Sequence, residues 1–352
     1  MSLESLQTAI RDAAASGAQL RLRGGGTKDF YGNAPRGSII DTRAYAGIVS
    51  YEPTELVVTA RCGTALSELE SALEGEGQCL PFEPPHFGAQ ATLGGCVAAG
   101  LSGPRRASAG ALRDFLLGVK IVDGRGRVMS FGGQVMKNVA GYDVARMIAG
   151  TLGTLGLIAE ASLKVLPRAP AELSLRLEMP LERAIEAMNR WAGRPLPITA
   201  TAWHEGELTL RLSGADVALR SARQALGGTA LDAAQAQARW RAVREHTHPF
   251  FAGNEPLWRI AVPSAAGPLA LEGKTLVEWS GGLRWLRSSA EAGAVRDAAR
   301  AVGGHATLFR ASDKSAGAFM PLPPVLARLH RELKNVFDPA GILNPGRLYP
   351  EL

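Results

Sequence analysis

Glycine is concentrated in a few short segments of this 352-residue chain, which contains 41 glycines. The run Arg23-Gly24-Gly25-Gly26-Thr27-Lys28 follows an alternating apolar and polar stretch, Gln19–Arg23, that predicts a β-strand. Three consecutive glycines allow a tight backbone and expose successive N–H groups, which can form an anion-binding nest beside two basic side chains. The residue order matches neither a Walker A loop nor a Rossmann fingerprint. For this segment alone, a flexible turn after the strand is an equal alternative.

Three further segments are rich in small residues. The stretch from Ala91 to Arg106 predicts a helix of alanine and glycine that reaches Ser102, with Thr92 as its N-cap and its first amides facing a phosphate. A small-residue helix packed tightly against a sheet is the alternative. The other two segments are Lys137–Asp143 and Gly150–Gly156, each of which alone predicts only a loop or a turn.

Composition excludes several classes of protein. Hydrophobic residues make up 46% and charged residues 20% of the chain, as in a soluble globular protein. The longest uncharged stretch, Pro84–Pro104, is broken by Gly, Pro and His, so we expect no transmembrane span, and the acidic N-terminus is no secretory signal. Three cysteines without C-x-x-C spacing favour a reducing, cytoplasmic location and no iron–sulfur or zinc site. Scattered basic residues and few aromatics predict no nucleic-acid partner.

The pattern of predicted elements changes at Pro167 and Pro170. Beyond them, strands alternate with longer amphipathic helices such as the one predicted over Ala233–Glu245. This alternation favours an α+β domain whose sheet is covered by helices on one face. We therefore expect one domain over 1–167 and a second over 168–336.

The four small-residue segments, in this order, resemble the FAD-binding domain of the vanillyl-alcohol oxidase/p-cresol methylhydroxylase (VAO/PCMH) superfamily. Within it, Gly110–Val119 and Pro81–Phe87 make the chain similar to the FAD-binding subunits of glycolate oxidase, most of all those of the E type. Phe337–Arg347 is typical of the wider D-lactate dehydrogenase/glycolate oxidase branch. The resemblance implies an α+β fold in which two α/β subdomains hold FAD beneath an α+β cap, with residues 337–352 returning to the FAD domain.

The resemblance also implies which positions bind FAD. Residues 23–28 match the pyrophosphate loop, residues 92–102 the segment beside the diphosphate and ribityl chain, and residues 156–158 the adenosine end. The matching positions are Arg23, Gly24, Gly25, Gly26, Thr27, Lys28, Thr92, Leu93, Gly94, Gly95, Ala98, Gly100, Ser102, Lys137, Asn138, Tyr142, Gly156 and Ile158. Tyr142 is equally explained as a packing aromatic. Covalent relatives attach the flavin to a His of the first loop, where this chain has Thr27, so we expect non-covalent FAD.

By the same resemblance, we expect a glycolate oxidase subunit that oxidises glycolate or another 2-hydroxy acid and passes electrons to an iron–sulfur subunit. A D-type flavoprotein subunit is the other expected partner, and any peripheral contact with the inner face of the cytoplasmic membrane would be made through these partners. The alternatives are a stand-alone 2-hydroxy acid dehydrogenase and a mainly structural flavoprotein subunit. The His- and Glu-rich metal site of the D-type relatives has no counterpart in this sequence, so we expect no metal.

The catalytic residues are not evident from the sequence. A 2-hydroxy acid needs a carboxylate clamp and a base, for which the candidates are Arg259, Arg284, His305 and Arg310. The first two arginines lie near tryptophans, so a structural Arg–Trp stack is favoured over a clamp. His305 and Arg310 are five residues apart and should face opposite sides of a regular strand.

A possible metal pair is formed by His246 and His248, which face one side only in an extended chain. The following Pro249 favours the simpler interpretation, that this segment ends a helix.

Overall fold

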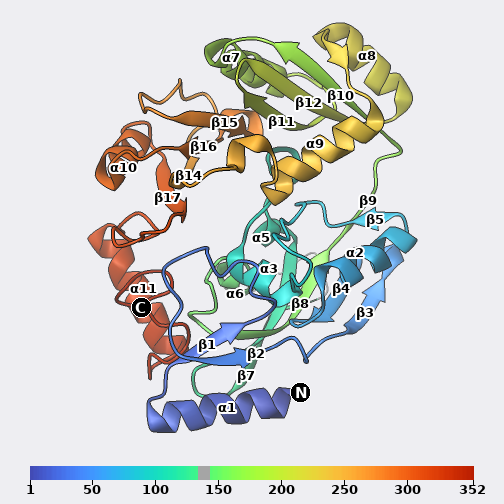
Figure 1. The fold of residues 1–352 in the computed structure, drawn as a ribbon. Coiled ribbons are helices and arrows are strands. Elements are labelled where there is room, and N and C mark those ends of the chain that lie inside the picture. The colour runs from blue at the N-terminus through green and yellow to red at the C-terminus, as the bar shows by residue number, and fades with distance from the viewer. Residues whose placement is uncertain (134–142) are drawn as a thin grey trace.

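A computed structural model describes residues 1–133 and 143–352 of the chain. Figure 1 shows an N-terminal half below and a second, mostly later half above, with the C-terminal helix α11 (Pro324–Phe337) beside the lower half. In the described residues the lower half contains a five-stranded sheet of order β3-β4-β8-β6-β7. Its strands are β3 (Ile48–Glu52), β4 (Val57–Arg61), β6 (Leu116–Val122), β7 (Val128–Gly132) and β8 (Leu157–Lys164).

Both faces of this sheet are covered by apolar side chains. One face packs against helices from the middle of the lower half, in a core that includes Leu69, Leu93 and Ile148. The other face packs against the N-terminal helix through Leu6 and Ile10. The remaining helices and strands of this half are α1 (Leu3–Ser16), β1 (Leu20–Arg23), β2 (Ser38–Asp41), α2 (Leu66–Gly75), β5 (Gln78–Cys79), α3 (Leu93–Ala99), α4 (Arg106–Ala109), α5 (Leu112–Phe115), α6 (Val144–Ile148) and β9 (Leu166–Pro167).

The upper half is built on an antiparallel sheet of eight strands in the described residues, with the order β13-β10-β12-β11-β15-β16-β14-β17. Its strands are β10 (Ala171–Glu178), β11 (Ile198–His204), β12 (Glu207–Gly214), β13 (Thr229–Ala230), β14 (Leu257–Ala261), β15 (Lys274–Glu278), β16 (Leu283–Arg287) and β17 (His305–Arg310). Its helices are α7 (Leu181–Ala192), α8 (Asp216–Leu226), α9 (Ala233–Glu245) and α10 (Ala292–Ala301).

The two faces of the upper sheet have different neighbours. Leu208, Leu210 and Leu212 pack under α7 and α8, and α10 covers the far end of the same face through Val295 and Ala299. The opposite face meets α9 and the lower half (Figure 1). The prediction of a sheet covered on one face is therefore incomplete, because the second face forms the contact with the lower half.

Local sequence patterns predicted several elements well. The helix expected over Ala233–Glu245 is α9 with the same bounds, and α1 ends at Ser16 because Gly17 adopts a left-handed φ of 69°. The small-residue helix is shorter than predicted. It ends at Ala99 because Gly100 turns left-handed at φ 62°, and a Cβ there would lie 2.9 Å from the backbone of Gly150.

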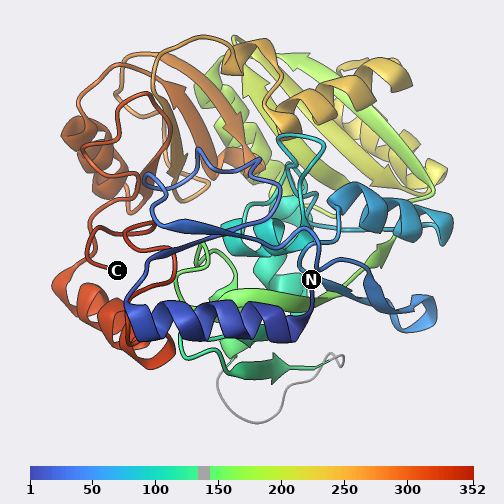
Figure 2. The same ribbon diagram turned by 60° about the horizontal axis from the view of Figure 1, so that its bottom comes forward.

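The C-terminal segment returns to the N-terminal strand β1. Leu343 forms a parallel bridge with Leu20, and the two neighbouring backbone hydrogen bonds measure 2.8 and 2.9 Å. Figure 2 shows this segment and α11 beside α1. Buried Lys334 fixes the segment by donating to the carbonyls of Thr154 and Leu343 and by pairing with Asp338 at 2.7 Å. No helix in the described part of the chain is long and apolar enough to cross a membrane.

Candidate functional site: a nucleotide cradle that leads to a central hollow

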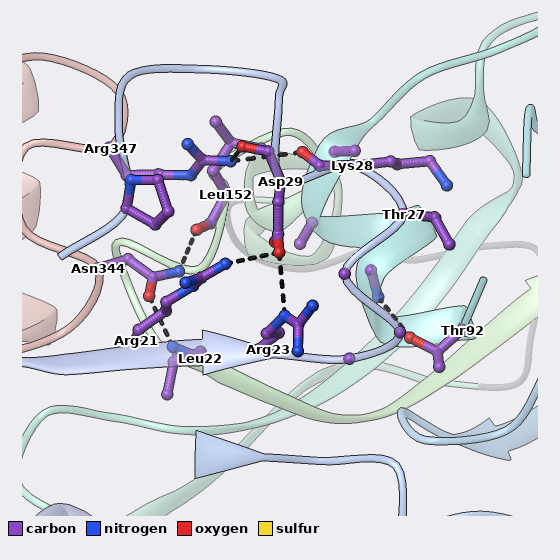
Figure 3. Close-up of a pocket in the computed structure, with 17 residues that line it drawn as sticks. Arg21, Leu22, Arg23, Thr27, Lys28, Asp29, Thr92, Leu152, Asn344 and Arg347 are labelled. Carbon is purple, nitrogen blue, oxygen red and sulfur yellow. Dashed lines mark hydrogen bonds and ion pairs between the residues drawn. The ribbon is translucent and has the colours of Figure 1, made fainter. Parts of the chain in front are cut away.

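The glycine run after β1 forms the wall of a pocket (Figure 3), which we call the nucleotide cradle. The cradle brings together four separate parts of the chain. Its lining residues are Arg21, Leu22, Arg23, Gly24, Gly25, Gly26, Thr27, Lys28, Asp29, Pro35, Thr92, Gly95, Ala98, Ala99, Leu152, Asn344 and Arg347.

Glycine is required in this run because the loop lies directly on the segment before α3. A Cβ on Gly24 would lie 2.2 Å from Thr92 Oγ1, and a Cβ on Gly25 would lie 1.5 Å from the carbonyl oxygen of Gln90. Side chains are therefore excluded on the side that faces the protein.

The same loop carries amide groups that the protein leaves without acceptors. The backbone N–H groups of Gly25, Gly26, Thr27 and Lys28 donate no hydrogen bond to the described part of the chain. Consecutive free amides of this kind suit an anion such as a diphosphate. The residues present therefore fit the diphosphate of a dinucleotide cofactor.

Charge in the cradle is predominantly positive. Asp29 accepts from Arg21 at 2.5 Å and from Arg23 at 3.0 Å, and its carboxylate lies between them in Figure 3. Lys28 and Arg347 have no carboxylate within ion-pair distance in the described residues. Burial lowers the pKa of Lys28, and it lowers the pKa of Arg347 to about 10. An anionic ligand would relieve the desolvation of these two cations.

Arg347 also shapes the loop that follows the glycine run. Its guanidinium donates to the carbonyls of Asn33, Asp29 and Lys28, the last two at 2.9 and 3.4 Å. Asn344 accepts from the Leu22 amide at 2.7 Å and donates to the Leu152 carbonyl at 2.6 Å. The C-terminal segment thus fixes the position of the backbone that lines the cradle.

A side pocket continues the cradle toward the five-stranded sheet. It is lined by Gly94, Gly95, Ala98, Gly156 and Ile158, all predicted cofactor-binding positions. Gly94 is close-packed here, because a Cβ on it would lie 2.6 Å from Cys62 Cβ.

The first turn of α3 does not offer its amides to a ligand. Leu93, Gly94 and Gly95 donate to the Thr64 carbonyl, the Cys62 carbonyl and Thr92 Oγ1, at 2.9, 2.8 and 3.3 Å. The expectation that these amides face a phosphate is therefore wrong, since the protein already satisfies them. The helix lines the cradle with its side, through Gly95 and Ala98.

Most of the predicted cofactor positions meet around these two pockets. Three predicted positions lie elsewhere: Leu93 is buried in the core, Gly100 packs on Gly150, and Ser102 lines a second cavity, described below. Lys137, Asn138 and Tyr142 lie outside the described residues. Sequence reasoning missed Asn344 and Arg347 as cradle residues, although the motif that contains them was noticed.

A second cavity, smaller than the cradle, lies where the two halves meet, and we call it the central hollow. Phe87 and Ser102 line it from the lower half, and Arg259, Glu278 and Trp285 from the upper sheet. Lys28 connects it with the cradle: it lines the cradle, and its Nζ lies 5.6 Å from the centre of the Phe87 ring. Lys28 and Phe87 thus place the two pockets next to each other.

Two charged groups in the hollow are only partly paired, and one of them, Glu278, is buried whereas Arg259 is half-buried. The Arg259 guanidinium stacks on Trp279 at 5.1 Å, yet it makes no hydrogen bond or ion pair with any described residue. Glu278 is 4% exposed and accepts a 2.7 Å bond from Trp285 Nε1. Burial raises the pKa of Glu278 to about 7, although the Trp285 bond and the charge of Arg259 oppose the shift.

The four catalytic candidates are not brought together. Arg259 alone among them lines the hollow. Arg284 lies on the opposite face of the sheet beside Ile260, and its guanidinium donates to three carbonyls, those of Gly281, Gly267 and Ala266. His305 is an exposed residue at the start of β17, outside the lining of the hollow.

Arg310 reaches the edge of the hollow because β17 is irregular. Leu257 pairs with Arg310 while Trp258 pairs with Leu308, so one extra residue is inserted in β17. The guanidinium of Arg310 lies over Phe30 at 4.3 Å and over Phe87 at 5.1 Å, both in the lower half. The prediction from regular strand alternation did not allow for this β-bulge.

His246 and His248 do not form a pair. His246 ends α9 with a left-handed φ of 56°, and its ring stacks on Phe251 at 3.9 Å. Burial, reinforced by Arg310 and Arg259, holds the pKa of His246 well below 6.5. His248 begins the next turn, where its Nδ1 accepts from the Phe250 amide at 3.2 Å.

These features define a flavoprotein of the FAD-linked oxidoreductase class. Residues 1–132 match the FAD binding domain family, and residues 314–348 match the C-terminal domain of FAD linked oxidases. The protein therefore binds FAD.

The chain belongs to the family of glycolate oxidase subunit GlcE. It is 47% identical to "Glycolate oxidase subunit GlcE" of Escherichia coli over 99% of this chain and 97% of that protein. It is also 30% identical to "Glycolate oxidase subunit GlcD" of Bacillus subtilis and 29% identical to a "D-lactate dehydrogenase" of Archaeoglobus fulgidus. These two matches cover 44% and 55% of this chain, and 33% and 44% of those proteins.

A solved structure of alkyldihydroxyacetonephosphate synthase has the same fold. It matches 97% of this chain and 75% of its own, with a TM-score of 0.69 and 15% sequence identity. This likeness supports the PCMH-type architecture alone.

Proposed function

We propose that the protein is the E-type FAD-binding component of a glycolate oxidase complex, which oxidises glycolate or a related 2-hydroxy acid to the 2-oxo acid. The observation that carries this proposal is the 47% identity to a glycolate oxidase subunit along almost the whole chain. The cationic cradle and the hollow next to it support it, since they suit a dinucleotide and a small acid. The bound flavin would supply the two-electron acceptor.

The division of the chain follows the same proposal. Residues 1–167 form the FAD domain, 168–336 the cap and 337–352 the returning segment. Residues 23–28 bind the pyrophosphate and residues 156–158 the adenosine end, and Lys137, Asn138 and Tyr142 are included as cofactor-binding positions on the sequence resemblance alone. Thr27 stands where covalent relatives carry the flavin-bearing His, and a threonine hydroxyl is no such ligand, so FAD is held non-covalently.

Arg259 binds the substrate carboxylate in this proposal. The half-buried guanidinium stacks on Trp279 and has no hydrogen-bond acceptor among the described residues, so a carboxylate can bind it in a bidentate manner. Arg310 adds positive charge at the edge of the hollow. Arg284 is not included, because carbonyl oxygens already occupy its guanidinium.

The partners are a D-type flavoprotein subunit and an iron–sulfur subunit that receives the electrons. The described residues contain no group of three or more His, Cys, Asp and Glu side chains that could hold a metal ion. An electron acceptor in another chain is therefore part of the proposal. The assembly is expected in the cytoplasm, and its partners would provide any contact with the inner face of the membrane.

The test is stopped-flow reduction of the flavin by glycolate and by D-lactate, with this chain alone and co-purified with both partners. We expect reduction in the co-purified assembly. Rapid reduction of the isolated chain would favour a stand-alone dehydrogenase instead. Steady turnover of the assembly without any change in this chain's flavin would indicate a mainly structural subunit.

A further inference from the structure

The central hollow contains one acidic side chain that the proposed function does not yet use. Glu278, at the end of β15, has one carboxylate oxygen bound to Trp285 Nε1. Its other oxygen makes no hydrogen bond or ion pair with any described residue. Glu278 itself lines the hollow. A buried carboxylate is normally fully paired, so a free oxygen beside a cavity marks a position where a ligand donor fits.

Glu278 and Arg259 face the same cavity from β15 and β14, which are separated by β16 in the sheet. Trp285 lies between them in the sheet, since it pairs with Arg259 on one side and with Leu276, two residues before Glu278, on the other. Arg259 is nevertheless more than an ion-pair distance away, because no salt bridge joins the two groups. The cavity is therefore lined by a cation and by a proton-accepting oxygen that are not paired with each other, the two groups that the carboxylate and the hydroxyl of a small acid require.

We propose that Glu278 is the catalytic base of this site, and that its free carboxylate oxygen accepts the hydroxyl proton of a 2-hydroxy acid bound to Arg259. This inference rests on the proposed function. In the step, the O–H bond breaks and its proton goes to Glu278, while the hydrogen on the adjacent carbon leaves with its electron pair for the two-electron acceptor. The carbon–oxygen double bond of the 2-oxo acid forms in the same step.

His246 is the other group in the hollow that can take up a proton. Its Nδ1 is buried and has no partner in the described part of the chain. Proton uptake would give the His246 ring a positive charge close to two other cations, Arg259 and Arg310, which disfavour that charge. The rings of Phe251 and Trp285 also surround it with apolar surface. Glu278 becomes neutral on protonation instead, and burial favours that product.

The charges that face Glu278 determine how it responds to ligands. Arg259 lies on β14, Glu83 contributes repulsion from the lower half, and Arg244 and His246 line the hollow at the end of α9. An anionic ligand on Arg259 adds a negative charge and shields the cation, so it raises the pKa of Glu278 further. Binding of such a ligand should therefore be accompanied by proton uptake.

The test compares Glu278→Gln with Glu272→Gln in the holoprotein co-purified with its partners. Glu272 is an exposed glutamate just before β15, so its variant removes the same charge from the same hairpin. Gln at 278 keeps an acceptor for Trp285. We expect E278Q to slow flavin reduction by roughly 10²- to 10⁴-fold, the usual contribution of a positioned base, and to abolish the acidic limb of the rate profile. E272Q should match the wild type, and Glu278→Asp should recover part of the rate and the limb.

A binding measurement provides a readout that does not depend on turnover. Oxalate is titrated by calorimetry at pH 8 in buffers of different ionisation enthalpy. We expect the wild type to take up a fraction of a proton and E278Q to take up none, with oxalate affinity equal to or tighter than that of the wild type. Proton uptake that persists in E278Q, or that is lost in a His246→Gln variant instead, contradicts the assignment.

The two proposals fail differently. If the wild type is reduced by glycolate and E278Q is reduced equally fast, Glu278 is not the base while the proposed function stands. If the wild-type assembly neither binds oxalate nor is reduced by any 2-hydroxy acid, the proposed function itself is wrong.

Discussion

Substitution of Gly25 by alanine tests whether the glycine run is an anion nest. The added Cβ would lie 1.5 Å from the Gln90 carbonyl oxygen, whereas ordinary contacts begin at 3.4 Å. The loop or the Gln90 backbone must therefore move by about 2 Å, far beyond hydrogen-bond tolerance. Displacement of one or two amides from a diphosphate removes charge-assisted bonds worth about 1.5–3 kcal/mol each. We expect a loss of about 2–4 kcal/mol in FAD binding, or roughly 30- to 1,000-fold in Kd.

The assay is titration of the apoprotein with FAD, followed by flavin fluorescence, together with urea unfolding of the apoprotein. Gly75→Ala is the matched control, because Gly75 ends α2 and its Cβ would meet nothing within 4 Å. It should bind FAD like the wild type, with unchanged or slightly higher stability. An FAD affinity for G25A within threefold of the wild type, in a protein that remains folded, would show that these amides do not hold the cofactor.

Four further outcomes are expected. Acid precipitation should leave the yellow cofactor in the supernatant, and colour in the pellet would contradict non-covalent binding. Arg284→Met should cost about 1–3 kcal/mol of unfolding free energy, since it leaves buried carbonyls unpaired, but should change oxalate affinity less than twofold in calorimetry. Lys334→Met should cost about 3–5 kcal/mol in urea unfolding, because Asp338 remains buried as an unpaired charge, and Asp338→Asn added to it should recover part of that loss. Burial raises the pKa of Glu278 from 4.5 to about 7, so ionisation of this side chain opposes folding. Thermal unfolding should therefore show that the stability of the wild type falls from pH 4.5 to pH 7, and that the fall is smaller in E278Q.

Elements with strong local signals were predictable from the sequence. Helix α9 has the predicted bounds because its helical pattern is followed by a histidine that turns left-handed before Pro249. The small-residue helix was predicted too long, since alanine and glycine also suit the close packing that ends it at Ala99. That packing depends on Gly150, fifty residues later, which no local pattern reveals.

In the candidate site, too, the residues whose role depends on their own segment were predictable, and those whose role depends on distant segments were not. The glycine run was recognisable because its proposed role depends on its own backbone. Arg347 was not, because its role is set by contacts with residues 28–33, more than 300 positions earlier. Glu278 was missed for a related reason: an isolated glutamate in a strand carries no signal until the lower half covers it. The bulge that directs Arg310 toward Phe30 likewise follows from the pairing of two strands.

The loop over residues 28–33 links the cofactor to the closure of the two halves. Lys314, just after the upper sheet, donates to the Phe30 and Gly32 carbonyls at 2.6 and 3.2 Å. Asn33 in turn accepts from the Ala318 amide at 2.8 Å. The loop that follows the anion nest is therefore shaped by the same residues that attach the upper half. An empty cradle leaves its cations desolvated without a counter-charge, so cofactor loss should loosen this attachment as well as the cradle. We therefore expect FAD binding to stabilise the arrangement in which Arg259 and Glu278 line one cavity.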